Sequence, residues 1–173
     1  MIECAKHDSN AQVYPFIVIG VTTSIRRSKI LSIRIADIDL QRRVIYIPKA
    51  KAGAREQPIT AQLVEFLGGW LCAMPSDSVW LFSAISKSGH AVGIRIPFRR
   101  VVTAAGLDPD LIVRHTLRHT AITHLVQAGI DLPTVKRISG HKTLAMVERY
   151  AHQNGAHLAA AMDKHEARLK LVS

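Results

Sequence analysis

Residues 115–119 of this chain read His-Thr-Leu-Arg-His, which brings two imidazoles and a guanidinium together in a short stretch. If the stretch is helical, positions three or four apart share a face, so His115, Arg118 and His119 lie on one side. Such a cluster is also typical of a solvated helix face. Two histidines in this spacing can bind zinc, but the fixed charge of Arg118 on the same face favours an anion over a dication. We therefore expect no metal here, and a packing or hydrogen-bonding role for His119.

A Gly-His dipeptide ending at His141 and a tyrosine, Tyr150, follow this cluster, and together they suit metal-free attack on a phosphodiester. Arginine offers a planar fork of donors that matches two phosphate oxygens. Imidazoles can donate to the same oxygens or move protons near neutral pH. A phenol has an unperturbed pKa of ~10, so its oxygen needs activating neighbours before it attacks phosphorus. A lysine on a hairpin could protonate the leaving 5′-oxygen.

The elements that must position these groups are mostly helical. Residues 42–48 alternate in a β-rich pattern, and residues 55–59 form a second extended piece, so we expect a β-hairpin whose turn carries Lys51. A short strand is also expected at 79–82. The fold class predicted is mainly α with a small antiparallel β-sheet (α+β). Thr60, Asp131 and Thr143 stand where N-caps are expected. Helices are expected at about 12–34 with a break near Ser24, and at 60–72, 94–105, 114–128, 132–138, 144–150 and 156–170.

The composition favours a folded protein with a basic surface that suits a nucleic acid. The chain has 173 residues with 23 Lys and Arg against 13 Asp and Glu, and its basic residues are spread along the whole length. A distributed positive charge suits a polyanion, although many soluble proteins are simply basic. Arg95, Arg99 and Arg100 could contact DNA or form a solvated helix face.

The cysteines and the apolar segments bear on the compartment. Two cysteines do not suggest a disulfide framework, and we find neither a membrane segment nor a secretory signal. We therefore expect a cytoplasmic protein.

Residues 22–59 and 112–152 resemble the motif regions of tyrosine recombinases of the phage-integrase type. The resemblance rests on Thr-Ser-Ile-Arg-Arg-Ser at 23–28, a hairpin lysine before a small residue and Gly, His-x-x-Arg, Gly-His, and Tyr in Glu-Arg-Tyr-Ala-His at 148–152. It implies the tyrosine-recombinase catalytic-domain fold. The catalytic residues that it implies are Arg26, Lys51, His115, Arg118, His141 and Tyr150.

The resemblance also implies a mechanism. Tyr150 would attack phosphorus to give a 3′-phosphotyrosine and a free 5′-hydroxyl, with Arg26 and Arg118 stabilising the phosphoryl oxygens. Lys51 would protonate the leaving oxygen, whereas which histidine accepts the phenolic proton stays open. The covalent intermediate keeps the ester-bond energy, so no cofactor, ATP or metal is implied. A partner strand's 5′-hydroxyl would then reverse the chemistry.

The expected partner is double-stranded DNA, bound by a homo-oligomer, as a tetramer. The apolar stripe of residues 158–172 could dock on a neighbouring subunit or pack on its own domain. The domain prediction is one catalytic domain over residues 1–173, without the N-terminal clamping domain of the family. Two alternatives remain: a type IB topoisomerase-like DNA relaxation, and a non-catalytic DNA-binding module that retains the fold.

Two residues depart from the family pattern near Arg26. Ser24 stands where the family commonly has Gly, and Lys29 where it commonly has an acid. Glycine permits backbone angles that serine disfavours, and an acid could orient a nearby cation. Neither departure removes a catalytic group, but both put the local support of Arg26 in question and allow for lowered activity.

Overall fold

The structure, a computed structural model, describes residues 1–48, 53–150, 162–163 and 165–166. Lys51 lies outside the described residues, as does most of the helix expected at 156–170. In chain order the elements are α1 (Ile2–Lys6), α2 (Val13–Thr23), α3 (Arg27–Leu31), a 3₁₀ turn (Ile35–Asp37), β1 (Ile38–Asp39), β2 (Val44–Ile47), β3 (Arg55–Pro58), α4 (Ala61–Cys72), α5 (Arg95–Ala104), α6 (Arg114–Gln127), α7 (Leu132–Ser139) and α8 (Ala145–Glu148).

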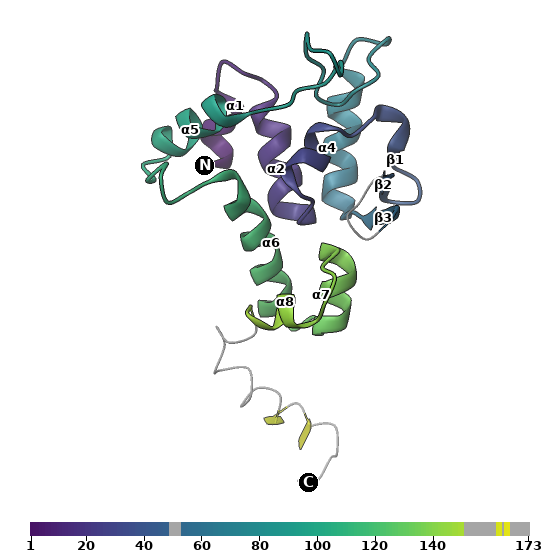
Figure 1. The fold of residues 1–173 in the computed structure, drawn as a ribbon, viewed down its shortest axis with the longest axis vertical. Coiled ribbons are helices and arrows are strands. Elements are labelled where there is room, and N and C mark those ends of the chain that lie inside the picture. Colours follow the sequence, from purple (N-terminus) through teal and green to yellow (C-terminus); the bar gives the residue numbers. More distant parts are fainter. Residues whose placement is uncertain (49–52, 151–161, 164, 167–173) are drawn as a thin grey trace.

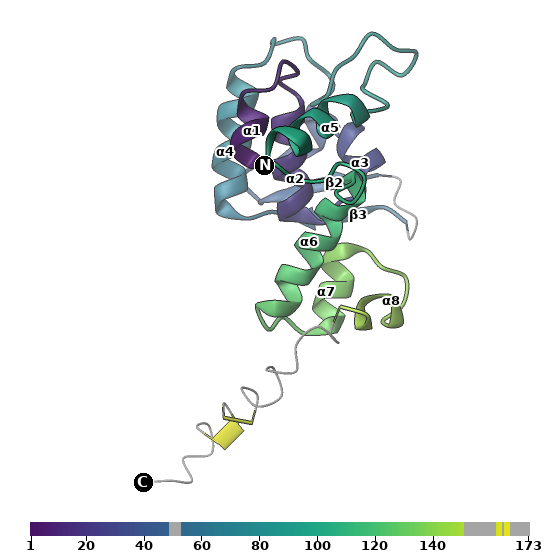
Figure 2. The same ribbon diagram turned by 90° about the vertical axis from the view of Figure 1, so that its left-hand side faces the viewer.

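These elements form a larger body and a smaller one, joined by α6. Helices α1 to α5 and the sheet pack around a core that includes Phe16, Ile45, Leu67 and Phe98. A second core joins the C-terminal half of α6 to α7 and α8, through Ile122, Val126, Val135, Val147 and Tyr150. In Figures 1 and 2, α6 runs from the larger body down to α7 and α8. One helix therefore contributes to both cores.

The sheet is a small antiparallel meander in the order β1-β2-β3. Ile45 pairs with Gln57 and Ile47 pairs with Arg55. Alternate β2 residues, Ile45 and Ile47, face the core, as expected for a strand with one solvated side. The expected hairpin is confirmed in its strands, while its turn at 49–52 lies outside the described residues.

Close contact between α2 and α6 sets the distance between the two helices. A β-carbon placed on Gly20 would lie 2.8 Å from Cδ1 of Leu117, which is closer than carbon atoms approach in real side chains. Helix α2 is otherwise built of large apolar residues, and its Pro15 sits in the first turn, where no backbone N–H is needed for helical bonding. Gly20 therefore lets α6 pack directly on the α2 backbone.

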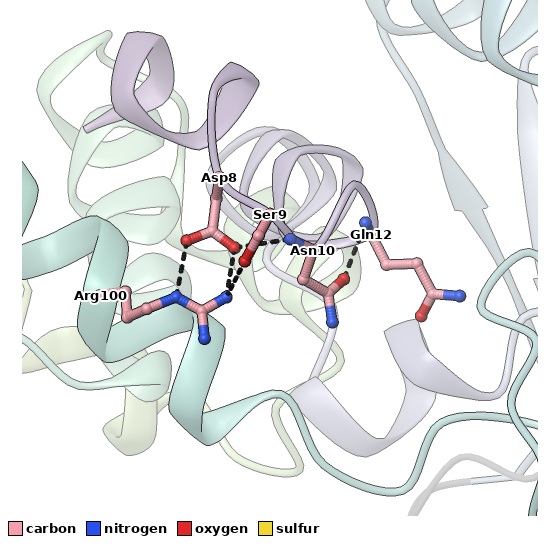
Figure 3. A network of polar contacts seen from close by, with 5 residues as sticks. All are labelled: Asp8, Ser9, Asn10, Gln12 and Arg100. Carbon is pink, nitrogen blue, oxygen red and sulfur yellow. Dashed lines mark hydrogen bonds and ion pairs between the residues drawn. The ribbon is translucent and has the colours of Figure 1, made fainter.

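A polar network fastens the loop between α1 and α2 to α5 (Figure 3). Arg100 donates to Asp8 through two nitrogens, at 3.0 and 2.7 Å, and to Ser9 at 2.9 Å. Asp8 also accepts from the backbone of Asn10. Arg99 pairs with Asp110. Two of the three α5 arginines considered for DNA contact, Arg99 and Arg100, thus form ion pairs within the chain.

The predicted helices up to Tyr150 are present, with local corrections. Thr60 and Asp131 cap α4 and α7 through their side chains as predicted. The N-cap of α8 is Leu144 rather than Thr143, because the helix starts later than its pattern indicates. The strand expected at 79–82 is wrong: Trp80 makes only an isolated bridge with Arg34. No helix within the described residues is both long and apolar enough to cross a membrane.

Candidate active site

Arg118 lies on α6 at the junction of the two cores, between Leu117 of the larger core and Ile122 of the smaller one. Its side chain is 3% exposed, so its charge needs specific partners. One guanidinium nitrogen donates to the carbonyl oxygen of Ser24, and the other lies 3.1 Å from Nε2 of His141. Arg118 thus ties the end of α2 to the loop after α7.

Ser24 ends α2 in a left-handed conformation, with φ of 57°. This geometry turns the chain sharply and places Arg26 at the start of α3 in an extended conformation. The hydroxyl of Ser24 is buried and has no hydrogen-bond partner among the described residues. The position thus calls for the backbone freedom of glycine, as the departure from the family pattern indicated.

Arg26 is half-buried, and its charge reaches Arg118, His141 and His115. In each case the nearby cation disfavours the protonated form and lowers the pKa. The same effect reaches Arg55. Arg26 and Arg118 therefore contribute to one positive field although they lie far apart in the sequence.

His141 is held by a chain of hydrogen bonds that fixes its tautomer. Gly140 ends α7 in a left-handed conformation, and His141 follows it. Because a guanidinium only donates, Nε2 of His141 accepts from Arg118, and Nδ1 then carries the proton. Nδ1 donates to Oγ of Ser139 over 2.8 Å, and that hydroxyl donates to the carbonyl of Lys136. Burial, followed by the charge of Arg118, lowers the pKa of His141 to about 4.

Tyr150 lies just beyond α8, and its ring forms part of the smaller core with only 5% of the residue exposed. Its hydroxyl remains accessible to polar partners. Oη is 2.7 Å from Nδ1 of His119, and a guanidinium nitrogen of Arg149 donates to it over 3.1 Å. The Tyr150 ring is also 6.4 Å from the ring of His141, measured between centroids.

His115 stands one helical turn before His119, and the two rings meet edge to face at 4.6 Å. His115 is the most exposed of the three histidines of the site. Its pKa is lowered first by desolvation and then by His119 and Arg118. The pKa of His119 is also lowered, first by desolvation and then by Arg149 and Arg118. Both rings are neutral at neutral pH.

Arg55 on β3 connects the hairpin to this site. It donates to the carbonyls of Ile138, at 2.7 Å, and Arg137, at 3.3 Å. These carbonyls belong to the last turn of α7, where unpaired acceptors and the helix dipole favour a cation. Its guanidinium also packs so closely on Gly140 that a β-carbon there would lie 3.0 Å from it.

The assembled site is strongly cationic. Burial, and then the charge of Arg26, lower the pKa of Arg118 to about 10. Within the described part of the chain, the ion pairs formed by carboxylates lie elsewhere, at Lys6, Arg42, Arg99 and Arg100. The arginines of the site therefore repel one another without an internal counter-charge. An oxyanion placed among them would gain strong stabilisation.

Five of the six residues expected from the resemblance gather here: Arg26, His115, Arg118, His141 and Tyr150. The sixth, Lys51, lies outside the described residues. The sequence prediction missed Arg149 and Arg55, and treated His119 only as a packing or hydrogen-bonding residue. The i, i+4 spacing of His115 and His119 was the available signal for His119. Arg55 gave no signal, since its carbonyl partners are more than eighty positions away.

Comparison with known proteins identifies the family. The sequence profile described as Phage integrase family matches residues 1–157. The chain belongs to the phage integrase family. This integrase-family chain is 31% identical over 154 residues to the tyrosine recombinase XerC of Mycobacterium tuberculosis (strain ATCC 25177 / H37Ra), a match that covers 82% of the chain and 50% of XerC. The chain thus spans about half the length of this relative.

Two solved recombinases have the same fold as this integrase-family chain. The crystal structure of XerA recombinase matches with a TM-score of 0.73 and 26% identity, over 95% of this chain and 59% of XerA. The XerH site-specific recombinase, solved bound to palindromic difH substrate in a post-cleavage complex, matches with a TM-score of 0.73 and 27% identity. That match covers 95% of this chain and 50% of XerH. The mainly α fold with a small antiparallel sheet is therefore that of tyrosine-recombinase catalytic domains.

Proposed function

We propose that this chain cleaves and rejoins DNA strands through a 3′-phosphotyrosine formed on Tyr150, as the catalytic domain of a site-specific recombinase or integrase. The observation that carries the proposal is the placement of a tyrosine hydroxyl beside a cluster of arginines that form no ion pair with any carboxylate of the described residues. Such a cluster suits a phosphodiester, whose non-bridging oxygens gain charge in the transition state.

The two strongest phosphate ligands in this proposal are Arg26 and Arg118. When a phosphate enters, the guanidinium of Arg118 turns its free donors to the phosphoryl oxygens. His141 keeps its bond from Arg118 and thereby orients that guanidinium, and His115 supplies an imidazole beside the phosphate. The negative charge of the phosphate attracts both arginines and thereby offsets the repulsion between them.

The reaction forms the bond between Oη of Tyr150 and phosphorus and breaks the bond between phosphorus and the 5′-oxygen. Lys51 on the hairpin turn protonates the departing 5′-oxygen. Attack by a 5′-hydroxyl of a partner strand on the phosphotyrosine restores the phosphodiester and releases Tyr150. Each step forms one phosphate ester bond for the one that it breaks, so the ester-bond energy is conserved and the exchange needs no external energy source.

The proposed substrate is double-stranded DNA, and the proposed location is the cytoplasm. XerH, which shares this fold, was solved bound to palindromic difH substrate in a post-cleavage complex. We propose that residues 1–173 act as one catalytic domain and that strand exchange takes place in a homotetramer on DNA. The C-terminal segment is the proposed subunit contact.

Covalent capture tests the proposal without a known target sequence. The full chain is incubated with a pool of nicked duplexes that carry randomised sequence on both sides of the nick. Cleavage near the nick releases a short fragment that diffuses away, and the protein–DNA adduct accumulates on a denaturing gel. We expect an adduct with the wild type and with Tyr46→Phe, a matched control on the exposed side of β2, but none with Tyr150→Phe.

We expect Arg118→Lys to reduce the adduct about 100-fold or more, because lysine cannot replace a bidentate donor. An adduct that persists in Tyr150→Phe would overturn the assignment of the nucleophile. DNA binding without any adduct would instead identify a non-catalytic binding module. Relaxation of a supercoiled plasmid by the chain without strand exchange would favour a topoisomerase-like activity.

A further inference from the structure

His119 contacts the reactive atom of the proposed nucleophile, although the resemblance to the family assigns it no part in the reaction. Its Nδ1 is 2.7 Å from Oη of Tyr150, a distance typical of a strong hydrogen bond. The ring of His115 contacts the ring of His119, with 4.6 Å between their centroids. His141, the other histidine of the site, has both ring nitrogens occupied by Arg118 and Ser139.

The second partner of the phenol leaves its proton available to His119. Arg149 can only donate, so Oη of Tyr150 accepts from it through one lone pair. When Nδ1 of a neutral His119 is unprotonated, the phenolic proton is donated to it and the second lone pair of Oη stays free. The free lone pair is the one that can attack phosphorus.

We propose that His119 accepts the phenolic proton as Tyr150 attacks the scissile phosphate. This inference rests on the proposed function and identifies the proton acceptor of its first step. As the bond between Oη and phosphorus forms, the bond between Oη and its proton breaks, and the proton moves to Nδ1 of His119. The resulting imidazolium returns the proton to Oη when the phosphotyrosine is resolved.

The surroundings of His119 fit an acceptor that is neutral before the reaction and charged during it. The charged and titratable groups that face it are His115 and Arg118 on its own helix, Arg149 and Tyr150 after α8, and His141. Before DNA binds, burial and then the charges of Arg149 and Arg118 lower the pKa of His119 and favour the unprotonated imidazole. The phosphate then brings negative charge that offsets theirs and stabilises the imidazolium.

The hydrogen bond itself can be tested without DNA. In histidine-labelled protein, long-range ¹H–¹⁵N NMR spectra distinguish a ring protonated on Nε2 from one protonated on Nδ1. We expect His119 to be protonated on Nε2, and its Nδ1 resonance to shift in Tyr150→Phe. The exposed His124, on the same helix, is the control that should not respond. A His119 ring protonated on Nδ1, or one indifferent to Tyr150→Phe, would overturn the inference.

Two substitutions then distinguish two roles of His119: positioning the phenol of Tyr150 by a hydrogen bond and accepting its proton. His119→Asn keeps an oxygen near the position of Nδ1 but cannot be protonated, whereas His119→Ala removes both functions. We expect both variants to slow adduct formation by about 100-fold or more, within the usual contribution of a general base, and His124→Ala to match the wild type. His119→Asn at the wild-type rate would reduce His119 to a positioning residue and contradict the proposal.

A modified leaving group and the pH profile complete the test. Duplexes captured by the wild type are remade with sulfur in place of the bridging 5′-oxygen, so that departure needs no proton. This change should rescue Lys51→Ala but leave His119→Ala slow.

The pH profile is a separate test. With the wild type, the rate of adduct formation should fall as pH drops through the lowered pKa of His119, and His119→Asn should lose that dependence. Rescue of His119→Ala by sulfur would overturn proton acceptance, whereas a wild type that cleaves no DNA would overturn the proposed function itself.

Discussion

Ser24 has a backbone conformation that a β-carbon disfavours, and its carbonyl oxygen is nevertheless the acceptor that holds Arg118. A left-handed conformation costs an L-residue roughly 1–2 kcal/mol, and a buried hydroxyl without a partner adds to that cost. Both destabilising contributions arise from the side chain of Ser24, whereas the bond to Arg118 uses only its backbone carbonyl. The two can therefore be separated by substitution.

Ser24→Gly should stabilise the protein by about 1 kcal/mol, because glycine adopts the left-handed conformation readily and loses only part of the gain to its greater unfolded-state entropy. The free energy of unfolding is measured by urea denaturation. Ser28→Gly, a nearby serine inside α3, is the control and should destabilise the protein. A destabilised Ser24→Gly would mean that the hydroxyl has a stabilising partner in solution.

At the scale of elements, sequence patterns located most helices because their apolar periodicity and caps are local. Thr60 and Asp131 are found at the predicted N-caps. The short elements α1 and β1 escaped prediction because five and two residues are too few to show a period. The prediction of a strand at 79–82 was wrong for a different reason. These residues are apolar, but Trp80 pairs with Arg34 only through an isolated bridge, so no strand forms there.

The sequence could predict the residues of the candidate site that belong to motifs, but it could not predict the contacts between residues far apart in the chain. Arg26, His115, Arg118, His141 and Tyr150 were all found from motifs. The contact between His119 and Tyr150 joins positions 31 apart, and it exists because α8 packs back on α6. Hydrogen bonds between distant elements follow from tertiary packing, which local patterns do not specify.

The α2–α6 contact yields a prediction about helix packing. Gly20→Ala should destabilise the protein by about 1–3 kcal/mol, since the added carbon would overlap Leu117 and push α6 away from α2. Gly69→Ala is the matched control in α4, where an added β-carbon meets no atom within 4 Å. That variant should be more stable by about 0.5–1 kcal/mol because alanine favours helix. Equal effects of both substitutions in urea denaturation would contradict the close α2–α6 contact.

At the scale of the whole molecule, the histidines of the site make stability depend on pH. The folded-state pKa of His141 is about 4, below its ordinary value of 6.5, so the unfolded chain binds more protons as pH falls below about 6.5. Protons therefore favour unfolding, and stability should decrease as pH falls from about 6.5 towards 4. The lowered pKa values of His115 and His119 act in the same direction.

Urea denaturation at pH 7.5 and pH 5.5 measures this dependence, and the wild type should unfold at lower urea at the lower pH. His141→Gln should be less stable at pH 7.5, yet lose less stability between the two pH values. A midpoint that does not change with pH in the wild type would show that His141 protonates freely in the folded protein.

Because α6 belongs to both hydrophobic cores, neither the larger nor the smaller body contains the whole candidate site. A fragment ending before α6 would retain most of the larger core together with Arg26 and Arg55, but it would lack Arg118, the histidines of the site and Tyr150. A fragment that starts at α6 would carry Arg118, His141 and Tyr150 without the backbone carbonyl of Ser24 that anchors the first of them. The chain cannot be divided into a binding piece and a reacting piece, so strand cleavage would itself report that the two bodies are correctly joined.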